Sequence, residues 1–350
     1  MPTGNDRVAR ETTMMKSIVC DTPGSLRMEQ RPVPVPAGDE VLVRIRRIGI
    51  CGTDMHIFRG TQPFLSYPRV MGHELSGHIE SAPAGSRLAV GDQVYVMPYL
   101  SCGTCVACRQ GKTNCCTRIE VLGVHRDGGM TEYLALPERF VFKTEGISLD
   151  DAAMIEFLAI GAHAVKRGAV DAARRVLVVG AGPIGMAVML FSSLKGAEVT
   201  VLDGRADRLQ FCRDALGISR TVQLGEGDKE QLADATDGEF FDVVFDATGN
   251  IAAMERGLDF VAHGGSYVLV SIVRDRLSFS DPEFHKRETT LLGSRNATVD
   301  DFEEVVAAMK AGKVPTALLN THRTTLDEFT NVLEHWMQPS TGVIKAIVEV

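Results

Sequence analysis

The sequence predicts an α/β protein in which a β-rich domain precedes a doubly wound parallel sheet of six strands. Two observations support this prediction. From about Met15 to Phe142, short apolar segments are separated by Gly/Pro turns, and helical periodicity is nearly absent. From about Arg175 to Ser294, strand-like and helix-like segments alternate, as they do in sheets with right-handed crossovers. The 350 residues are enough for two domains that share an interface.

The composition limits the class of protein. Hydrophobic residues make up 45% of the chain and charged residues 23%, as in ordinary globular proteins. The net charge of −8, with no block of Lys and Arg, argues against a nucleic-acid partner. Residues 1–14 are predicted to be a polar tail without the apolar centre of a signal peptide. We therefore expect a cytoplasmic protein with reduced thiols.

One uncharged stretch, Val176–Leu194, is long enough to cross a bilayer. Because Gly180, Gly182 and Pro183 interrupt it, a strand, a tight turn and a helix are predicted there instead of a membrane span.

Each domain contains recognisable elements. In the first, "EVLVRIRRIGI", "DQVYVMPYL" and "TEYLALP" predict strands of a small barrel. In the second, helices are predicted within 207–217 and 251–261, and the strands are "RVLVVG", "EVTVLD", "RTVQL", "FDVVFDATG", "SYVLVS" and "TTLLGS". The last fifty residues predict two helices, within 299–314 and 326–337, and a strand at 344–350 that returns to the first domain.

Five of the eight cysteines lie in "CGTCVACRQGKTNCC". Cys102, Cys105 and Cys108 have the spacing C-x₂-C-x₂-C, which lets neighbouring thiolates converge on a tetrahedral zinc ion. The fourth ligand is Cys115 or Cys116. Four thiolates leave no open position for a substrate, so a structural zinc site is predicted, in preference to a set of inert buried cysteines.

A catalytic zinc ion needs three protein ligands and one open position. "GICGTDMH" offers Cys51, and "VMGHELSGH" offers His73 and Glu74. A helix is predicted in "SLDDAAMIEFLAIGAHAVKRG", with Ser148 and Asp151 as its capping box. Glu156 then lies among alanines and an isoleucine, where a carboxylate is costly unless it is paired or binds a metal.

"VLVVGAGPIG" places Gly180, Gly182 and Gly185 in the pattern G-x-G-x-x-G between a Val-rich strand and a helix. In that context the glycines allow a tight turn, approach of a pyrophosphate to the backbone, and close helix–sheet packing. Asp203 ends the next strand, where a carboxylate binds ribose hydroxyls and repels a 2′-phosphate. This favours NAD over NADP, although Arg205 could accommodate NADP.

Together these motifs resemble the zinc-dependent medium-chain dehydrogenases, which include alcohol, sorbitol and threonine dehydrogenases. The resemblance extends from Met15 through "GICGTDMH", "GHELSG", "GDQV", the cysteine stretch, "GAGPIG" and "LLGSRN". It implies a GroES-like catalytic domain at 15–165 with a zinc lobe near 98–118, a Rossmann domain at 166–295, and a return at 296–350. "TQPFLSYPRVMGHE" and "FSDPEFHKRETTLLGSRNAT" resemble the bacterial branch of L-galactonate and L-gulonate 5-dehydrogenases.

The resemblance also implies roles for individual residues. Cys51, His73 and Glu156 would bind the catalytic zinc, while Glu74 either binds it or exchanges with water. Asp54 would orient the histidine, Thr53 and His56 would form a proton relay, and the family spacing selects Cys116 over Cys115. His125, Arg295 and Asn296 are substrate candidates, each of which is otherwise a solvated loop residue. The cofactor candidates are Gly180, Gly182, Pro183, Ile184, Gly185, Asp203, Arg208, Thr248, Val270 and Ser271.

The sequence therefore predicts an enzyme that transfers a hydride from a secondary alcohol of a sugar acid or polyol to NAD, with one catalytic and one structural zinc ion. Three alternatives stay open: a polyol or other alcohol dehydrogenase, a zinc-free reductase, and an NAD-binding regulatory protein without turnover. The resemblance implies a homodimer or homotetramer, and no nucleic acid or membrane is expected as a partner.

Overall fold

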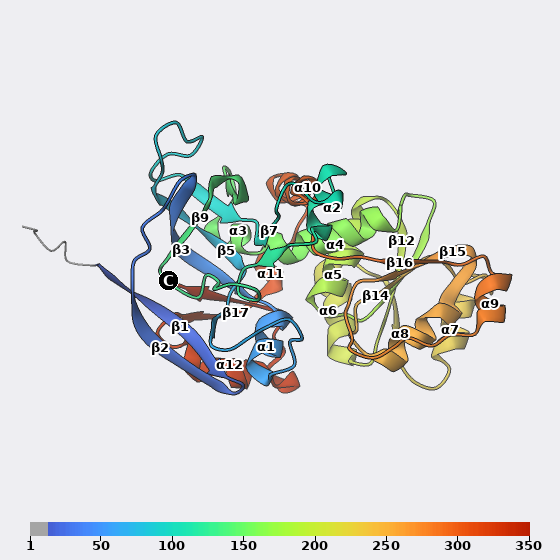
Figure 1. Cartoon of the computed structure of the whole chain (residues 1–350). Helices are drawn as coiled ribbons and strands as arrows, with labels where there is room; N and C mark the ends of the chain where they lie inside the picture. Colours follow the sequence, from blue (N-terminus) through green and yellow to red (C-terminus); the bar gives the residue numbers. More distant parts are fainter. Residues whose placement is uncertain (1–12) are drawn as a thin grey trace, which may run out of the picture.

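The computed structural model describes residues 13–350. Two bodies lie side by side along the long axis of the molecule (Figure 1). One is made from the N-terminal part of the chain, in blue and teal, together with the C-terminal strands, in red. The other is made from the yellow and orange middle of the chain. The chain thus leaves the first body, builds the second and returns.

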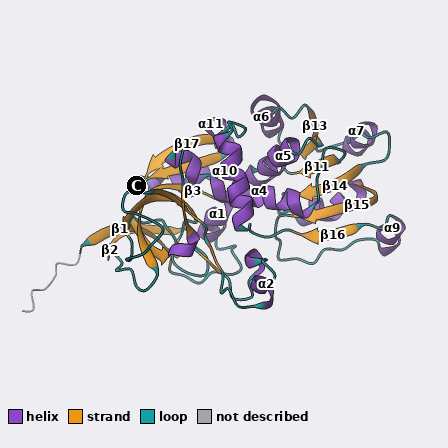
Figure 2. Cartoon of the chain, turned by 90° about the horizontal axis from the view of Figure 1, so that it is seen from above, coloured by secondary structure: helices purple, strands orange, loops and turns teal. Residues whose placement is uncertain are grey.

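The first body is built on a seven-stranded sheet with the order β10-β6-β5-β3-β18-β17, in which β9 also pairs with β3. The sheet is strongly curved (Figure 2). Its late strand β18 is antiparallel to β3, with Ala346 opposite Ile50, and parallel to β17. The strands are β3 (Glu40–Ile50), β5 (Glu74–Ser81), β6 (Gln93–Val96), β9 (Tyr133–Pro137), β10 (Val141–Lys143), β17 (Asn320–Thr325) and β18 (Lys345–Glu349).

Smaller elements surround this sheet. A three-stranded sheet has the order β2-β1-β4, and the pair β7-β8 flanks the cysteine stretch. The strands are β1 (Met14–Thr22), β2 (Ser25–Pro32), β4 (Arg69–Val70), β7 (Tyr99–Leu100) and β8 (Glu120–Val121). The helices are α1 (Gly52–Arg59), α2 (Val106–Arg109), α3 (Leu149–Ala153), α4 (Ile155–Arg167), α10 (Val299–Lys310), α11 (Thr316–Leu319) and α12 (Phe329–Trp336), with 3₁₀ turns η1 (Thr113–Cys115), η2 (Glu138–Phe140) and η4 (Pro339–Thr341).

The second body confirms the predicted six-stranded parallel sheet. Its order is β13-β12-β11-β14-β15-β16, which is the 3-2-1-4-5-6 order of a Rossmann fold. The strands are β11 (Arg175–Val179), β12 (Glu198–Asp203), β13 (Arg220–Gln223), β14 (Phe241–Asp246), β15 (Val261–Leu269) and β16 (Thr290–Gly293). The helices are α5 (Pro183–Leu194), α6 (Ala206–Leu216), α7 (Asp228–Asp234), α8 (Ile251–Gly257) and α9 (Asp281–Lys286), with the 3₁₀ turn η3 (Leu258–Phe260).

The apolar core follows from the alternation of side chains along β11. Val176 and Val178 belong to a large cluster that continues through α5 and α4 into the first body. Leu177 and Val179 belong to a smaller cluster on the other face of the parallel sheet. Within residues 13–350, no helix combines the length and apolar character needed to cross a membrane. The uncharged stretch is divided between β11 and α5, as its glycines and proline predict.

The segment 148–167 differs from the single helix expected there. Ser148 and Asp151 form the capping box, but α3 ends at Ala153 and α4 starts at Ile155. Met154 lies between the two helices with φ −97° and ψ −1°. As a result, Glu156 lies in the first turn of a helix and not in the middle of one.

Candidate active site and metal centres

Cys51, His73 and Glu74 converge where β3 ends and β5 begins. Cys51 follows β3 and is the N-cap of α1, while Glu74 is the first residue of β5. One ligand atom from each residue lies within 4.8 Å of the others. Gly49 is opposite Glu74 in the ladder, and a Cβ there would be 2.1 Å from Glu74 Oε2. Glycine at this position is therefore required for the Glu74 carboxylate to occupy its place.

Three polar atoms in this region are buried without a hydrogen-bond partner: His73 Nδ1, Glu74 Oε2 and Glu156 Oε2. Buried polar atoms nearly always have partners, so three such atoms together fit the binding of a cation. A thiol, an imidazole and carboxylates are the ligand types that zinc uses in catalytic sites. The donor set fits the predicted catalytic zinc ion.

Glu156 is 4% exposed and lies beside this group. Its Oε1 accepts a hydrogen bond from the Tyr99 hydroxyl. Burial raises the pKa of Glu156 to about 7, and the positive charge of His73 opposes that rise. Because Tyr99 holds one oxygen, only the second oxygen is left free to bind a metal. Glu74 lies within the tight group of ligand atoms, whereas Glu156 lies outside it but close enough for the charges of His73 and Glu74 to affect its pKa.

Lys345 is a component of the site that our sequence interpretation missed. It lies on β18, is 1% exposed, and donates a hydrogen bond to Glu74 Oε1. Its Nζ is also 4.4 Å from the centroid of the Phe157 ring. Burial lowers the pKa of Lys345, but the Glu74 carboxylate, together with the negative charges of Cys51 and Glu156, outweighs that effect, and the net pKa is raised. The available signal was a single lysine in the apolar strand "IKAIVEV".

Asp54 connects the two loops that carry the ligands. Its Oδ2 accepts a hydrogen bond from Cys51 N (2.9 Å), and its Oδ1 accepts one from Gly72 N (3.1 Å). The carboxylate lies 3.9 Å from His73 Nδ1, beyond hydrogen-bond distance. Burial lowers the pKa of His73, but the negative charges of Asp54 and Cys51 raise it above its ordinary value.

The predicted proton relay lies on α1, which starts beside Cys51. Thr53 is in the first turn, and His56 is one turn further along the helix. The His56 ring forms a hydrogen bond with Thr61 Oγ1 (2.9 Å). Burial of part of the ring and the charge of Arg59 lower the pKa of His56. The imidazole is therefore mainly neutral near pH 7 and can accept a proton.

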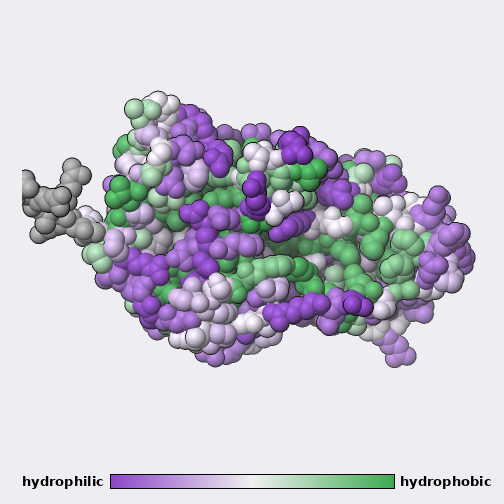
Figure 3. Space-filling model, viewed as in Figure 1, coloured by the Kyte–Doolittle hydropathy of each residue, from purple (hydrophilic) through white to green (hydrophobic). Residues whose placement is uncertain are grey.

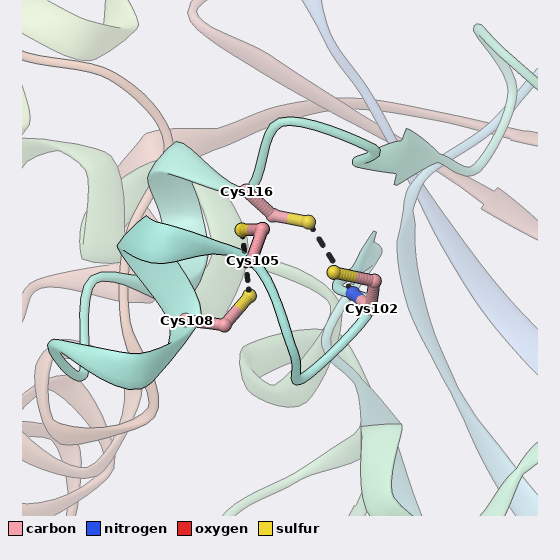
Figure 4. Close-up of side chains that lie close together, drawn as sticks. All are labelled: Cys102, Cys105, Cys108 and Cys116. Atoms are coloured by element: carbon pink, nitrogen blue, oxygen red, sulfur yellow. Dashed lines mark hydrogen bonds between the residues drawn. The ribbon is translucent and has the colours of Figure 1, made fainter.

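The structure brings together Cys102, Cys105, Cys108 and Cys116 (Figure 4). Cys116 is buried, whereas Cys115 is exposed and outside the cluster. Hydrogen bonds from Thr104 lower the pKa of Cys102 to about 5, and the Cys108 backbone lowers that of Cys105 to about 6. These two thiols are readily ionised, as zinc ligands must be, whereas burial and a hydrogen bond with Cys105 raise the pKa of Cys108 to about 11. The cluster fits a four-thiolate metal site.

The glycine-rich turn has the geometry that a dinucleotide requires. Gly180 has φ +102°, and a Cβ at Gly185 would lie 1.8 Å from Gly180 O. A Cβ at Gly182 would meet nothing within 4 Å, so its backbone faces open space. Pro183 and Ile184 open α5, whose N-terminus points to this space. These positions fit the binding of a pyrophosphate.

Asp203 and Thr248 line a small cavity beside Gly180. The Asp203 carboxylate is oriented by hydrogen bonds from Ala181 N (2.6 Å) and Arg205 N (2.7 Å). Arg208 does not line this cavity, and its guanidinium donates a hydrogen bond to Val343 O in the first body. Asp203 therefore lines this cavity, whereas Arg208 does not.

Asp246 organises the other wall of the cofactor region. It is fully buried at the end of β14 and accepts hydrogen bonds from Thr248 Oγ1 (3.0 Å) and Ser271 Oγ (2.9 Å). Val270 lies between β15 and Ser271. Burial raises the pKa of Asp246, and the hydrogen bonds from Thr248 and Ser271 oppose the rise. Our sequence interpretation named Thr248 and Ser271 but missed the aspartate that holds them.

His125 and Arg295, two of the three substrate candidates, lie close enough for the charge of Arg295 to affect the His125 ring. His125 is stacked on Phe64 with ring centroids 6.2 Å apart, and its pKa is lowered by burial and by the charge of Arg295. Asn296 has φ +53° and its Nδ2 donates a hydrogen bond to Asn114 O (3.4 Å).

The face shown in Figure 3 has a hollow between the two bodies with apolar surface around it.

Comparison with known proteins defines the class. Residues 37–146 match the family model of the alcohol dehydrogenase GroES-like domain, and residues 183–311 match that of the zinc-binding dehydrogenases. The chain belongs to the family of zinc-dependent alcohol and polyol dehydrogenases, and the predicted resemblance is confirmed.

Among individual relatives, the chain is 41% identical over 335 residues to L-galactonate-5-dehydrogenase of Escherichia coli K12, covering 95% of this chain and 98% of that protein. It is 27% identical to sorbitol dehydrogenase of Bacillus subtilis 168, covering 95% and 97%. The crystal structure of an alcohol dehydrogenase from E. coli CFT073 in complex with NADH has a TM-score of 0.90 and 29% identity, covering 96% and 99%.

Proposed function

We propose that this protein oxidises a secondary alcohol of a sugar acid of the L-galactonate or L-gulonate type with NAD as the acceptor. The observation that carries the proposal is the buried donor set of Cys51, His73 and Glu74, with Glu156 beside it. The L-galactonate-5-dehydrogenase relative supports a sugar acid as substrate, and the sorbitol dehydrogenase relative supports a polyol as the alternative.

In this proposal, Cys51 and His73 hold zinc together with Glu74 or Glu156. When bound, zinc favours the alkoxide form of the substrate hydroxyl, and NAD accepts the hydride. Asp54 fixes the Cys51 loop, and Lys345 neutralises part of the negative charge on Glu74. The Thr53 hydroxyl would relay the substrate's proton, giving up its own proton as it accepts one, and the neutral His56 would take up the relayed proton and release it to solvent.

The cofactor is held by the turn at Gly180, Gly182 and Gly185 and by Asp203. The carboxylate of Asp203 accepts hydrogen bonds from ribose hydroxyls, which selects NAD. Arg295 pairs with the substrate carboxylate, and His125 and Asn296 contact its hydroxyls. The side chain of Arg295 is exposed and makes no hydrogen bond or ion pair with any residue in the range 13–350, so it is available for a ligand.

The test is NADH formation by the zinc-loaded enzyme with a panel of aldonates, including L-galactonate and L-gulonate, and alditols, including sorbitol. The proposal predicts the highest kcat/KM with an aldonate. Activity with alditols alone would show that the substrate is a polyol and not a sugar acid. If NAD binds but no alcohol gives zinc-dependent NADH, a regulatory binding protein is the better interpretation.

We further propose that the protein is a cytoplasmic homodimer or homotetramer. All eight cysteines are free, in agreement with a reducing compartment. Strand β16 is at the end of the parallel sheet, and Leu291 on it is 38% exposed, so an edge is open for pairing with a second copy. Light scattering after gel filtration tests this proposal, and a monomer at micromolar concentration contradicts it.

A further inference from the structure

Asn114 connects the cysteine lobe to the segment that carries the substrate candidates. It lies in η1, between Cys108 and Cys116, and is only 3% exposed although the surrounding loop is polar. The side-chain Nδ2 of Asn114 donates a hydrogen bond to the backbone oxygen of Arg295 (2.9 Å). The backbone oxygen of Asn114 accepts one from Asn296 Nδ2 (3.4 Å). One residue of the lobe thus contacts two successive residues of the segment 294–297.

His163 completes the arrangement from the other side. Asn114 Nδ2 lies 3.1 Å from His163 Nε2, and His163 Nδ1 lies 2.7 Å from Asp301 Oδ2. The Arg295 carbonyl fixes the orientation of the Asn114 amide, because the rotated amide would place two oxygens in contact. The amide nitrogen can only donate, so His163 accepts at Nε2 and donates from Nδ1 to Asp301.

Asp301 extends this chain to the start of α10. Its Oδ2 accepts hydrogen bonds from Thr298 N (2.8 Å) and Thr298 Oγ1 (2.7 Å), which form the capping box of that helix. Asp301 and His163 are both buried. The hydrogen bonds therefore fix Asn114 between α4 and α10, and Asn114 in turn holds the segment 294–297.

The other supports of the segment lie at its two ends. At its start, Ser294 N donates a hydrogen bond to Leu269 O (2.9 Å), and at its end Ala297 is buried in the core next to Thr298, the N-cap of α10. Between them, Asn296 has the left-handed φ of +53°, a conformation that asparagine adopts more readily than other non-glycine residues. A cavity of about 620 Å³, lined by Asn114, His163 and Arg295 among others, leaves that side of the segment without packing.

We propose that Asn114 is a positioning residue, through which the cysteine lobe sets the placement of Arg295 and Asn296 and hence the affinity for the substrate. The lobe then has a second role beyond stability, because its fold determines where the substrate segment lies. This inference rests on the proposed function, in which Arg295 contacts the substrate.

The test compares Asn114→Ala and the shape-conserving Asn114→Asp with wild type, as zinc-loaded full-length enzymes. Both variants lose the donor to Arg295 O. We expect KM for L-galactonate to rise about five- to tenfold, as for one lost hydrogen bond, with kcat changed less than about twofold. Zinc content and NAD affinity should stay at wild-type values. Cys115→Ser, an exposed neighbour in the same turn, is the matched control and should leave KM unchanged.

Hydrogen exchange provides a second measurement that does not need turnover. The amides of Arg295, Asn296 and Ala297 should exchange faster in both Asn114 variants, while the β16 amides keep their wild-type rates. Unchanged KM and unchanged exchange would overturn the proposal, as would a parallel loss of zinc and NAD binding, which indicates general collapse of the lobe. If wild type oxidises no sugar acid, the proposed function fails, whereas the exchange result still decides the role of Asn114.

Discussion

Lys345 and Glu74 form an ion pair in which both side chains are almost completely buried. The lysine comes from β18 and the glutamate from β5, which are 271 positions apart in the sequence and are separated in the sheet by β3. Glu74 also belongs to the group of Cys51, His73 and Glu74 that we propose as the site of the catalytic zinc. In that proposal, one carboxylate both pairs with Lys345 inside the sheet and contributes charge to the metal site.

Replacing Lys345 by Met should leave the buried Glu74 carboxylate without its cation. We expect the free energy of unfolding to fall by about 3 kcal/mol, because breaking a buried pair exposes the cost of the remaining charge. Urea denaturation of the zinc-loaded protein measures this change. Lys345→Arg keeps the positive charge, so its free energy of unfolding should fall by less than that of Lys345→Met. A loss below about 1 kcal/mol for Lys345→Met would contradict the prediction.

Cys116→Ser should remove the zinc ion of the cysteine lobe, because zinc in a structural site needs all four ligands. Elemental analysis should give about two zinc ions per chain for wild type and about one for the variant, with a lower melting temperature. Cys115→Ser should keep both ions. The reverse result for the two variants would assign the fourth ligand to Cys115.

Asp203→Ala should weaken the preference for NAD. The variant loses charge-assisted hydrogen bonds to the ribose, so kcat/KM with NAD should fall at least about tenfold. Because the repulsion of a 2′-phosphate is also lost, kcat/KM with NADP should rise. Asp214→Asn, which removes an exposed carboxylate on α6, serves as the control. Unchanged cofactor preference in Asp203→Ala would show that another group selects the cofactor.

The lowered pKa of His56 predicts the position of the acidic limb of the pH profile. The relay needs the neutral ring, so kcat/KM should decrease only as the pH falls below the pKa of His56, which lies under the ordinary value of about 6.5. Arg59→Gln removes a positive charge that lowers this pKa, and the limb should move to higher pH. Arg59→Lys keeps the charge and should leave the limb in place. Movement to lower pH in Arg59→Gln would contradict the assignment.

Arg295→Ala should raise KM for aldonates much more than for alditols, because only the acids carry a carboxylate for the guanidinium. We expect a rise of about tenfold or more for L-galactonate, corresponding to a charge-assisted pair. Steady-state kinetics with both substrate classes measures the ratio. Equal effects on acids and neutral polyols would remove Arg295 from the carboxylate site.

The features predictable from sequence were those that depend on local spacing. Alternating apolar strands and helices give the Rossmann sheet, and the glycines of "GAGPIG" have the conformations that their spacing requires. The cysteine stretch is also local, since four ligands within fifteen residues can converge only around one point. In each case the residues that interact are close together in the chain.

The missed features join residues that are far apart in the chain. Lys345 meets Glu74 across β3, and Tyr99 meets Glu156 from a separate strand. Asn114 and His163 are separated by 49 positions and come together only when the lobe packs on α4. The interruption at Met154 was not expected because the residues on both sides of it favour helix. Periodicity carries no information about such pairs.

The position of β18 between β3 and β17 also determines the order in which the chain can acquire its structure during synthesis. All six strands of the parallel sheet leave the ribosome before Lys345, so the Rossmann body can fold first, as an inserted unit. Until β18 emerges, residues 47–50 of β3 lack the partner strand that they have in the finished sheet, and Glu74 lacks the ammonium group of Lys345. The reaction centre is thus assembled late, and a ribosome that stalls within the last strand would release a chain that binds nucleotide but has no finished catalytic site.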